Sequence, residues 1–408
     1  MQRVLARPTG RFERKREAIL DAATALLNAR GVRGLTLGEV AEAVGLSTTS
    51  VTYYFKRKDE LAGACMLRGI AALEAMAADA LSAASPEARL HRLLALYLQR
   101  LRQIAEGAAA PLPSLADLRA LNPPALQTVF QAYMALFRRV RTLFDAPELD
   151  RLTRGRRTAR THLVLEQLFW AAAWLRNYDP EDYAAVGEAM FDILSHGVAA
   201  PGAAWAPLPL TVAEPTAHGR QEMSRDTFLL AATRLINARG YRGASVDKIS
   251  ASLNVTKGSF YHHNEAKDDL VVDCFARTFA IMRRVQDLAS ALPSDPWVRL
   301  SSAAAALAEF QLSDQGPLLR ASALSAVPEP IRRDMVEEAN RVSERFAGMI
   351  AAGEAQGSMR PVDAFIAAQM LTATLNAAAD LSFWVPDVRP KAAPAVFVRP
   401  LLMGLFAR

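Results

Sequence analysis

An all-α fold is predicted by three features of the 408-residue sequence. Alanine and leucine dominate the composition, and both residues favour helices. Stretches with the alternating pattern of a β-strand are few. A long segment also recurs 209 residues further along the chain, because Thr36–Leu61 and Ser245–Leu270 carry related residues at matching positions. A repeat of this length indicates a duplicated domain, since solenoid units repeat about every 20–50 residues.

The first copy, Thr36–Leu61, has the pattern of two short helices separated by a tight turn. Thr36 and Glu39 form a T-x-x-E capping box at which a helix begins. Gly45 ends that helix, because glycine takes the left-handed conformation without steric cost. Ser47 then caps a second, polar helix. Two helices joined in this way are typical of the helix-turn-helix that reads the major groove of DNA.

Each copy resembles the N-terminal DNA-binding domain of the TetR family of one-component transcriptional regulators. The resemblance is close over Arg14–Ile70 and Met223–Phe279 and rests on the residues after the turn, STTSVTYYFKRKDEL and TKGSFYHHNEAKDDL. It implies two tandem TetR-like units, each a three-helix helix-turn-helix domain followed by an α-helical domain for ligand binding and dimerisation. It also implies a double-stranded DNA operator and a small-molecule effector as partners.

The repeat and the composition together predict five segments. They are a reading domain (1–62), a helical regulatory domain (63–198), a linker rich in Pro and Gly (199–221), a second reading domain (222–271) and a second regulatory domain (272–408). The last two helices of the first half have broad apolar surfaces, which indicates a face shared with a partner domain. We expect either an intrachain pseudo-dimer or a homodimer of chains with four reading units.

The expected helices follow apolar periodicity and are bounded by Gly and Pro. Gly31 ends the first helix, and four prolines make the last one short or kinked. Besides the two short helices of each reading unit, the ranges are Arg14–Arg30, Lys58–Leu81, Glu87–Glu106, Pro124–Phe144, Arg156–Asn177, Pro180–Val198, Ser224–Arg239, Ala266–Ser290, Asp295–Leu312, Pro330–Gln356, Pro361–Trp384 and Ala395–Phe406.

Residues that contact DNA are predicted at the start and along the flank of each second short helix, where small or polar side chains face bases and donors reach phosphates. The candidates are Ser47, Thr48, Thr49, Ser50, Tyr53, Lys56, Lys58, Thr256, Lys257, Gly258, Ser259, Tyr261, His262 and Lys267. Lys58 and Lys267 each open a helix, where the helix dipole disfavours a cation. A lysine there in both copies suggests a phosphate contact, with a solvated side chain as the alternative.

The two copies depart from the family pattern in different ways. The first has Thr48, Thr49 and Thr52 where Lys, Gly and Tyr are usual, and the second has Asn264 in place of the buried Phe. One hypothesis is that the halves read different half-sites, so that the operator is an imperfect palindrome or none at all. The alternative is a ligand-binding or protein-interaction module with one degenerate reading unit.

Aromatic and polar residues of the regulatory domains are candidates for an effector pocket, which would suit an apolar or aromatic ligand. The alternative for each is ordinary core packing. They are Tyr97, Phe130, Tyr133, Trp170, Trp174, Phe310, Met335, Asn376 and Trp384.

Composition and motifs narrow the remaining functions. A net charge of +6 suits a polyanionic partner. Cys65 and Cys274 are interpreted as buried apolar residues inherited by duplication, with a redox pair as the alternative, and two unpaired thiols suit a reducing cytoplasm. No apolar segment is expected to span a bilayer. We find no nucleophile motif, metal-ligand spacing or phosphate-binding glycine loop, so we expect no enzyme activity, no cofactor and no metal.

Overall fold

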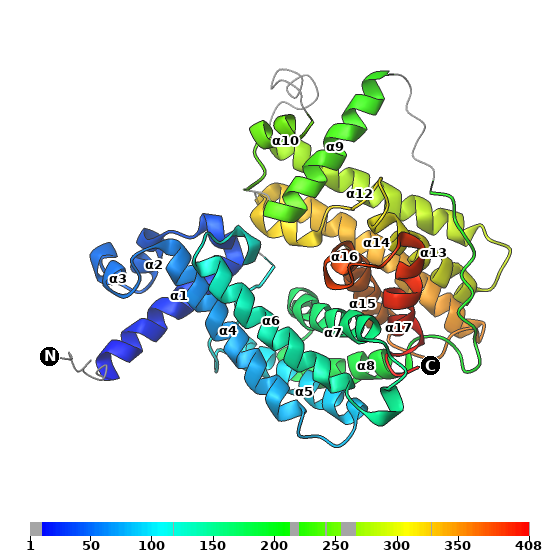
Figure 1. Cartoon of the computed structure of the whole chain (residues 1–408), viewed down its shortest axis with the longest axis horizontal. Coiled ribbons are helices and arrows are strands. Elements are labelled where there is room, and N and C mark those ends of the chain that lie inside the picture. The colour runs from blue at the N-terminus through cyan, green and yellow to red at the C-terminus, as the bar shows by residue number, and fades with distance from the viewer. Residues whose placement is uncertain are drawn as a thin grey trace.

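The computed structural model describes residues 10–116, 118–212, 220–240, 243–253, 267–327 and 329–407. Within these ranges the regular structure is helical, and the extended pairing is confined to an isolated bridge between Ala199 and Met359. The predicted all-α fold is therefore confirmed. The helices of the two halves lie side by side, with the reading units at the left and top of Figure 1.

The first half forms eight α-helices between residues 10 and 196. They are α1 (Gly10–Gly34), α2 (Leu37–Ala43), α3 (Thr48–Tyr54), α4 (Lys58–Ala80), α5 (Pro86–Ala105), α6 (Ala125–Arg141), α7 (Arg154–Trp174) and α8 (Tyr183–His196). The predicted ranges hold within a few residues. The largest difference is α1, which begins at Gly10 and continues past a break at Gly31, where φ is 68°.

The second half repeats this plan over its described residues. Its α-helices are α9 (Arg220–Arg239), α10 (Val246–Ser252), α12 (Lys267–Ser290), α13 (Pro296–Gln311), α14 (Glu329–Ala355), α15 (Ala364–Ala377), α16 (Leu381–Trp384) and α17 (Arg399–Met403). Short 3-10 helices at Leu118–Ala120 (η1) and Ala321–Ala326 (η7) occupy related places in the two halves. The last helix is short, as its prolines predict, and follows a π-helical turn at Pro394–Val398.

The two halves join through a central bundle in which α7 and α8 pack against α15 and α17 (Figure 1). Polar side chains of α7 reach the second half through its interior. The Gln167 amide donates to the carbonyl of Met370 at 3.0 Å and to the hydroxyl of Thr374 at 2.9 Å, and Arg160 Nε donates to the carbonyl of Leu405 at 2.7 Å. The apolar face predicted on the last helices of the first half is therefore shared with the second half.

Two glycines lie at a close contact between the halves, where α8 and α17 end. Gly197 has φ 73° and Gly404 has φ 98°. The amide of Val198 donates to the carbonyl of Leu402 at 2.9 Å, and the amide of Leu405 donates to the carbonyl of Leu194 at 2.7 Å. A Cβ on Gly197 would lie 2.3 Å from the Leu402 oxygen. The positive φ and this contact both require glycine.

A neutral histidine lies inside the bundle. His162 is buried, and its Nε2 donates to the carbonyl of Ala377 at 3.0 Å. Burial lowers the pKa of His162 to about 4. One turn later, partial burial together with the charge of Asp380 raises the pKa of Glu166 to about 7. The stability of the contact between the halves should therefore depend on pH, through two groups whose pKa values are shifted in opposite directions.

We expect the stability contributed by His162 to be present above about pH 6.5, the pKa of the unfolded residue. It is lost as the pH falls from about 6.5 to about 4, because the unfolded chain binds the proton first, and the loss is at most about 3 kcal/mol. Glu166 opposes this change, since its contribution decreases as the pH rises from about 4.5 to about 7. Urea unfolding between pH 4.5 and 8 measures both effects.

In that series, His162→Gln is expected to flatten the loss of stability below pH 6.5. Glu166→Gln is expected to steepen it, because the opposing group is gone. Parallel pH curves for the two variants and the natural chain would contradict this assignment.

The linker starts at the bundle and then follows α13. The indole of Trp297 donates to the carbonyl of Ala204 at 2.9 Å, and Trp205 packs edge-on against that indole. The amide of Leu208 donates to the hydroxyl of Ser302 at 2.8 Å. The linker is thus held on the second half from Ala204 to Leu208.

The two cysteines lie in equivalent places and are both free and buried. Cys65 Sγ donates to the carbonyl of Leu20 and Cys274 Sγ to that of Leu229, each at 3.6 Å. Burial raises the pKa of both thiols, that of Cys274 to about 12. Each cysteine thus ties one long helix to the first helix of its own reading unit. This supports a packing role and not a redox pair.

α4 differs from the expectation that no segment could span a membrane. α4 is long and apolar enough to cross a bilayer by length and composition alone. Half of its most apolar window is buried, however, and residues such as Met66 and Ile70 lie in the protein core. Core helices pass the same test, because their apolar residues are covered by other helices.

Candidate nucleic-acid interface

The first reading unit is built by the caps that the sequence predicts. The hydroxyl of Thr36 accepts the amide of Glu39 at 3.2 Å and donates to its carboxylate at 2.7 Å, which completes the cap of α2. Gly45 then turns the chain with φ 64°. The hydroxyl of Ser47 accepts the amide of Ser50 at 3.2 Å, so α3 begins at Thr48. These contacts fix both ends of the turn before α3.

α3 is anchored through one face and exposed over the others. Val51 is fully buried, and Phe55 at its end is also buried. Thr48 and Thr49 are exposed, whereas Ser50 is half-buried with its hydroxyl 2.9 Å from that of Ser47. The helix lies at the outer edge of the molecule (Figure 1). It therefore presents the small polar side chains of Thr48 and Thr49 to the outside of the molecule.

An aromatic group that sequence reasoning missed joins the start of α1 to the end of α3. The rings of Phe12 and Tyr54 lie 4.7 Å apart, and Tyr53 packs edge-on against both. The guanidinium of Arg16 lies 5.6 Å from the Phe55 ring centre. Tyr53 nevertheless keeps 75% of its surface exposed. Its ring is thus supported from one side while its hydroxyl remains accessible.

The two predicted lysines of the first unit differ in their surroundings. Lys56 is exposed, and its backbone amide donates to the carboxylate of Glu60 at 3.1 Å. The ammonium of Lys58 donates to the carbonyl of Arg33, at the end of α1, at 3.2 Å. This bond explains a cation at the start of α4, because it satisfies a helix-terminal carbonyl. A phosphate contact by Lys58 stays a prediction.

The second reading unit is described only as far as its turn. The hydroxyl of Ser245 accepts the amide of Lys248 at 3.4 Å and caps α10, as Thr36 caps α2. Lys267 is the first residue of α12. The other candidates of this unit lie outside the described residues: Thr256, Lys257, Gly258, Ser259, Tyr261 and His262.

Equivalent asparagines attach each reading unit to its own half. The Asn28 amide donates to the carbonyl of Leu112 at 2.8 Å and accepts the amide of Ser114 at 2.7 Å. Asn237, at the same place in α9, donates to the carbonyl of Leu318 at 2.9 Å and accepts the amide of Arg320 at 3.0 Å. Each asparagine therefore ties a first helix to the loop before a regulatory helix.

Those two loops meet at one carboxylate. Asp380 pairs with Arg119 of the first half at 3.2 Å and with Arg320 of the second half. Burial alone would raise the pKa of Asp380, but the two arginines outweigh it and hold the pKa below its usual value. In addition, α1 packs against η7 and α9 against η1, each across the boundary between halves. One junction thus holds both reading units.

The structure brings only some of the predicted effector residues together. Tyr133 and Trp384 lie 6.1 Å apart, beside a stacked Phe137, and Phe130 contacts the neighbouring Phe383. This aromatic cluster joins α6 to α16 across the two halves. Tyr97, Trp174 and Phe310 are buried elsewhere, and Trp170, Met335 and Asn376 are half-buried. Two cavities, of about 360 and 300 Å³, are lined by other residues.

Comparison with known proteins points to one family for both reading units. A model described as bacterial regulatory proteins of the tetR family matches residues 19–65 and 228–274. A curated relative, the HTH-type transcriptional repressor DhaR from Mycobacterium sp. (strain GP1), is 29% identical over 131 residues, which are 31% of this chain and 66% of the relative. The match thus spans slightly less than two thirds of that protein.

Solved structures of similar proteins each correspond to less than half of the chain. A TetR-family regulator from Bordetella parapertussis 12822 is 18% identical with a TM-score of 0.39, covering 45% of this chain and 94% of its own. The TetR-family regulator PfmR from Thermus thermophilus is 20% identical with a TM-score of 0.36, covering 43% and 95%. With a match to the family model in each half and a helical fold, the chain carries two TetR-family DNA-binding units in tandem.

Proposed function

We propose that the protein is a sequence-specific transcriptional repressor whose two reading units grip one operator from a single chain. The observation that carries this proposal is α3, a capped helix held by buried Val51 with exposed Thr48 and Thr49. Small polar side chains at the start of such a helix can approach base edges in the major groove. The exposed Tyr53 and Lys56 would reach the phosphates on either side.

The pairing of the two halves is the second part of the proposal. Repressors of the helix-turn-helix class present two recognition helices to successive turns of DNA, about 34–36 Å apart. Here α7, α8, α15 and α17 form a bundle within one chain, and Asp380 joins the loops that hold both reading units. We infer that this intrachain pseudo-dimer replaces the pairing of two separate chains.

The effector is the third part. The aromatic cluster of Phe130, Tyr133, Phe137, Phe383 and Trp384 lies between α6 of the first half and α16 of the second. An apolar or aromatic ligand that separated these rings would change how the halves meet. Such a change would alter the spacing of the reading units, and with it operator affinity. Trp384 fluorescence, with Trp384→Phe as the control, provides a direct assay for candidate effectors.

A charge on α3 tests the DNA contact most simply. Thr49→Glu is expected to weaken binding to the DNA flanking the protein's own gene at least about 100-fold, because a carboxylate would face phosphates and base edges. The thermal midpoint should stay within about 2 °C, since the site is exposed. Thr128→Glu, exposed on α6, is the matched control and should bind as the natural chain does. Equal binding by both variants would rule out α3 as the reading helix.

The two reading units are expected to contribute unequally. Thr49 in the first unit corresponds to Gly258 in the second, and Lys257 has Thr48 as its counterpart. We therefore propose that the units read different half-sites and that Thr49→Ala and Lys257→Ala weaken protection of different halves of the footprint. A symmetric operator with equal effects of both substitutions would end this part of the proposal.

A further inference from the structure

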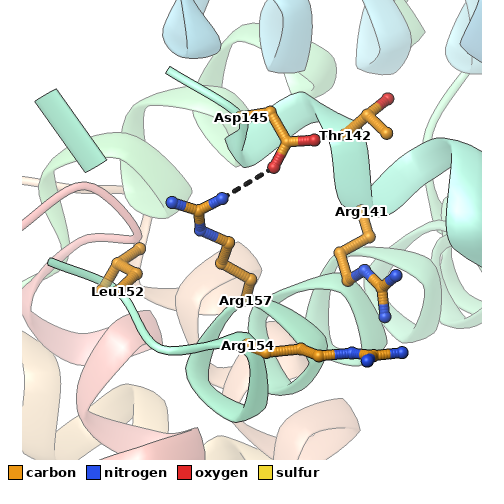
Figure 2. Close-up of a pocket in the computed structure, with 6 residues that line it drawn as sticks. All are labelled: Arg141, Thr142, Asp145, Leu152, Arg154 and Arg157. Atoms are coloured by element: carbon orange, nitrogen blue, oxygen red, sulfur yellow. Dashed lines mark hydrogen bonds and ion pairs between the residues drawn. The ribbon is translucent and has the colours of Figure 1, made fainter. Parts of the chain in front are cut away.

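A cavity lined by several arginines lies where α6 ends and α7 begins. This end of α6 points away from α3 in Figure 1. Its volume is about 360 Å³, and its lining residues are Arg141, Thr142, Asp145, Leu152, Arg154 and Arg157. Figure 2 shows these side chains around the opening, with three arginines against one carboxylate.

Only one of the three arginines is neutralised. Arg157 donates to the carboxylates of Asp145 at 2.8 Å and Asp150 at 3.3 Å, and to the carbonyl of Leu149 at 3.2 Å. Neither Arg141 nor Arg154 has an ion pair within the part of the chain that the structure describes. In Figure 2 their guanidinium groups lie on the same side of the cavity. The three arginines and the two carboxylates on Arg157 thus leave the cavity with a net positive charge.

Arg154 also stands where a helix disfavours a cation. It is the first residue of α7, and the first turn of that helix has no acidic residue. The positive end of the helix dipole costs a cation there about 0.3–1 kcal/mol. The Thr153 hydroxyl caps only the amide of Arg156, at 3.3 Å. A negative group in the cavity would offset the helix dipole and the repulsion between the two arginines.

We propose that this cavity binds a small molecule that carries a phosphate group. Guanidinium groups bind phosphate oxygens in pairs, with charge-assisted hydrogen bonds. The volume lies at the low end of ligand sites and equals about a dozen water molecules, so a phosphorylated compound fits better than a bare ion. Leu152 supplies an apolar wall for its organic part. The site lies outside the aromatic cluster and adds a second, anionic ligand class to the protein.

Calorimetric titration of the full chain with inorganic pyrophosphate tests the proposal, at constant ionic strength set with sodium chloride. We expect saturable binding at one site per chain. The double variant Arg141→Gln/Arg154→Gln should weaken it at least about tenfold, whereas its apo form should melt at or above the natural midpoint, because repulsion is relieved. A parallel titration with inorganic phosphate separates a site for a single phosphate from one that needs a larger ligand.

Arg156→Gln is the matched control, because Arg156 is exposed in the same turn of α7 and does not line the cavity. It should bind pyrophosphate as the natural chain does. The proposal is overturned if pyrophosphate shows no saturable binding up to about 10 mM, or if the double variant and Arg156→Gln lose binding equally. Equal loss would indicate general attraction of anions to a basic surface.

Discussion

Gly197→Ala is expected to destabilise the protein by roughly 3–5 kcal/mol. Gly197 has φ 73° and ψ −162°, a backbone region that costs other residues about 1–3 kcal/mol. The new Cβ would also lie 2.3 Å from the carbonyl oxygen of Leu402, so the ends of α8 and α17 would have to separate. The hydrogen bonds from Val198 to Leu402 and from Leu405 to Leu194 would then break, each worth about 1 kcal/mol. Urea unfolding followed by circular dichroism measures the loss.

Gly202 provides the control for the backbone effect alone. It has φ 82°, and a Cβ placed on it would meet no atom within 4 Å. Gly202→Ala should therefore cost only about 1 kcal/mol. If Gly197→Ala were as mild as Gly202→Ala, the close approach of the two helix ends would not be present in solution.

Asp380→Asn is expected to have the next largest effect, about 2–3 kcal/mol. The substitution preserves the shape of the side chain but removes the charge that Arg119 and Arg320 share. Removing one partner of a buried ion pair costs about 3–5 kcal/mol, and the partial exposure of these side chains reduces that cost. Since the arginines hold the pKa of Asp380 low, its contribution is present above about pH 3.8 and is lost as the pH falls through the lowered pKa. Urea midpoints at pH 7 compare the variant with the natural chain.

A double-mutant cycle separates this junction from a general loss of charge. Asp380→Asn combined with Arg320→Gln should cost less than the sum of the two single changes, by about 1 kcal/mol or more. Asp387 is exposed and lies seven residues further along the chain, so Asp387→Asn is the control and should cost less than about 0.5 kcal/mol. Additive costs would show that Asp380 and Arg320 do not depend on each other. Because these residues anchor both loops, Asp380→Asn should also weaken operator binding more than Asp387→Asn does.

Local features of the fold could be predicted from the sequence because they depend on few neighbouring residues. Thr36, Gly45 and Ser47 cap and turn the chain through contacts within four residues, and each takes its predicted role. The duplication also predicts equivalent contacts in the two halves. Cys65 donates to the carbonyl of Leu20, and Cys274 donates to the carbonyl of the equivalent Leu229. Apolar periodicity also placed the long helices within a few residues.

Features that join distant segments could not be predicted in the same way. Asp380 has no acidic counterpart in the first half, so the repeat gave no signal for its pairs with Arg119 and Arg320. The glycines at 197 and 404 are ordinary helix ends in sequence, which does not reveal that each lies against the backbone of the other half. Aromatic composition likewise failed to distinguish core residues such as Tyr97 from the cluster around Trp384.

The number of chains on one operator tests the central proposal most directly. Sedimentation equilibrium of the protein alone and with a duplex that carries its binding site gives both masses. The intrachain pseudo-dimer predicts one 44.4 kDa chain free in solution and one chain per duplex, with footprint protection on two successive turns of DNA. Two chains per duplex, or protection of a single turn by one chain, would contradict it.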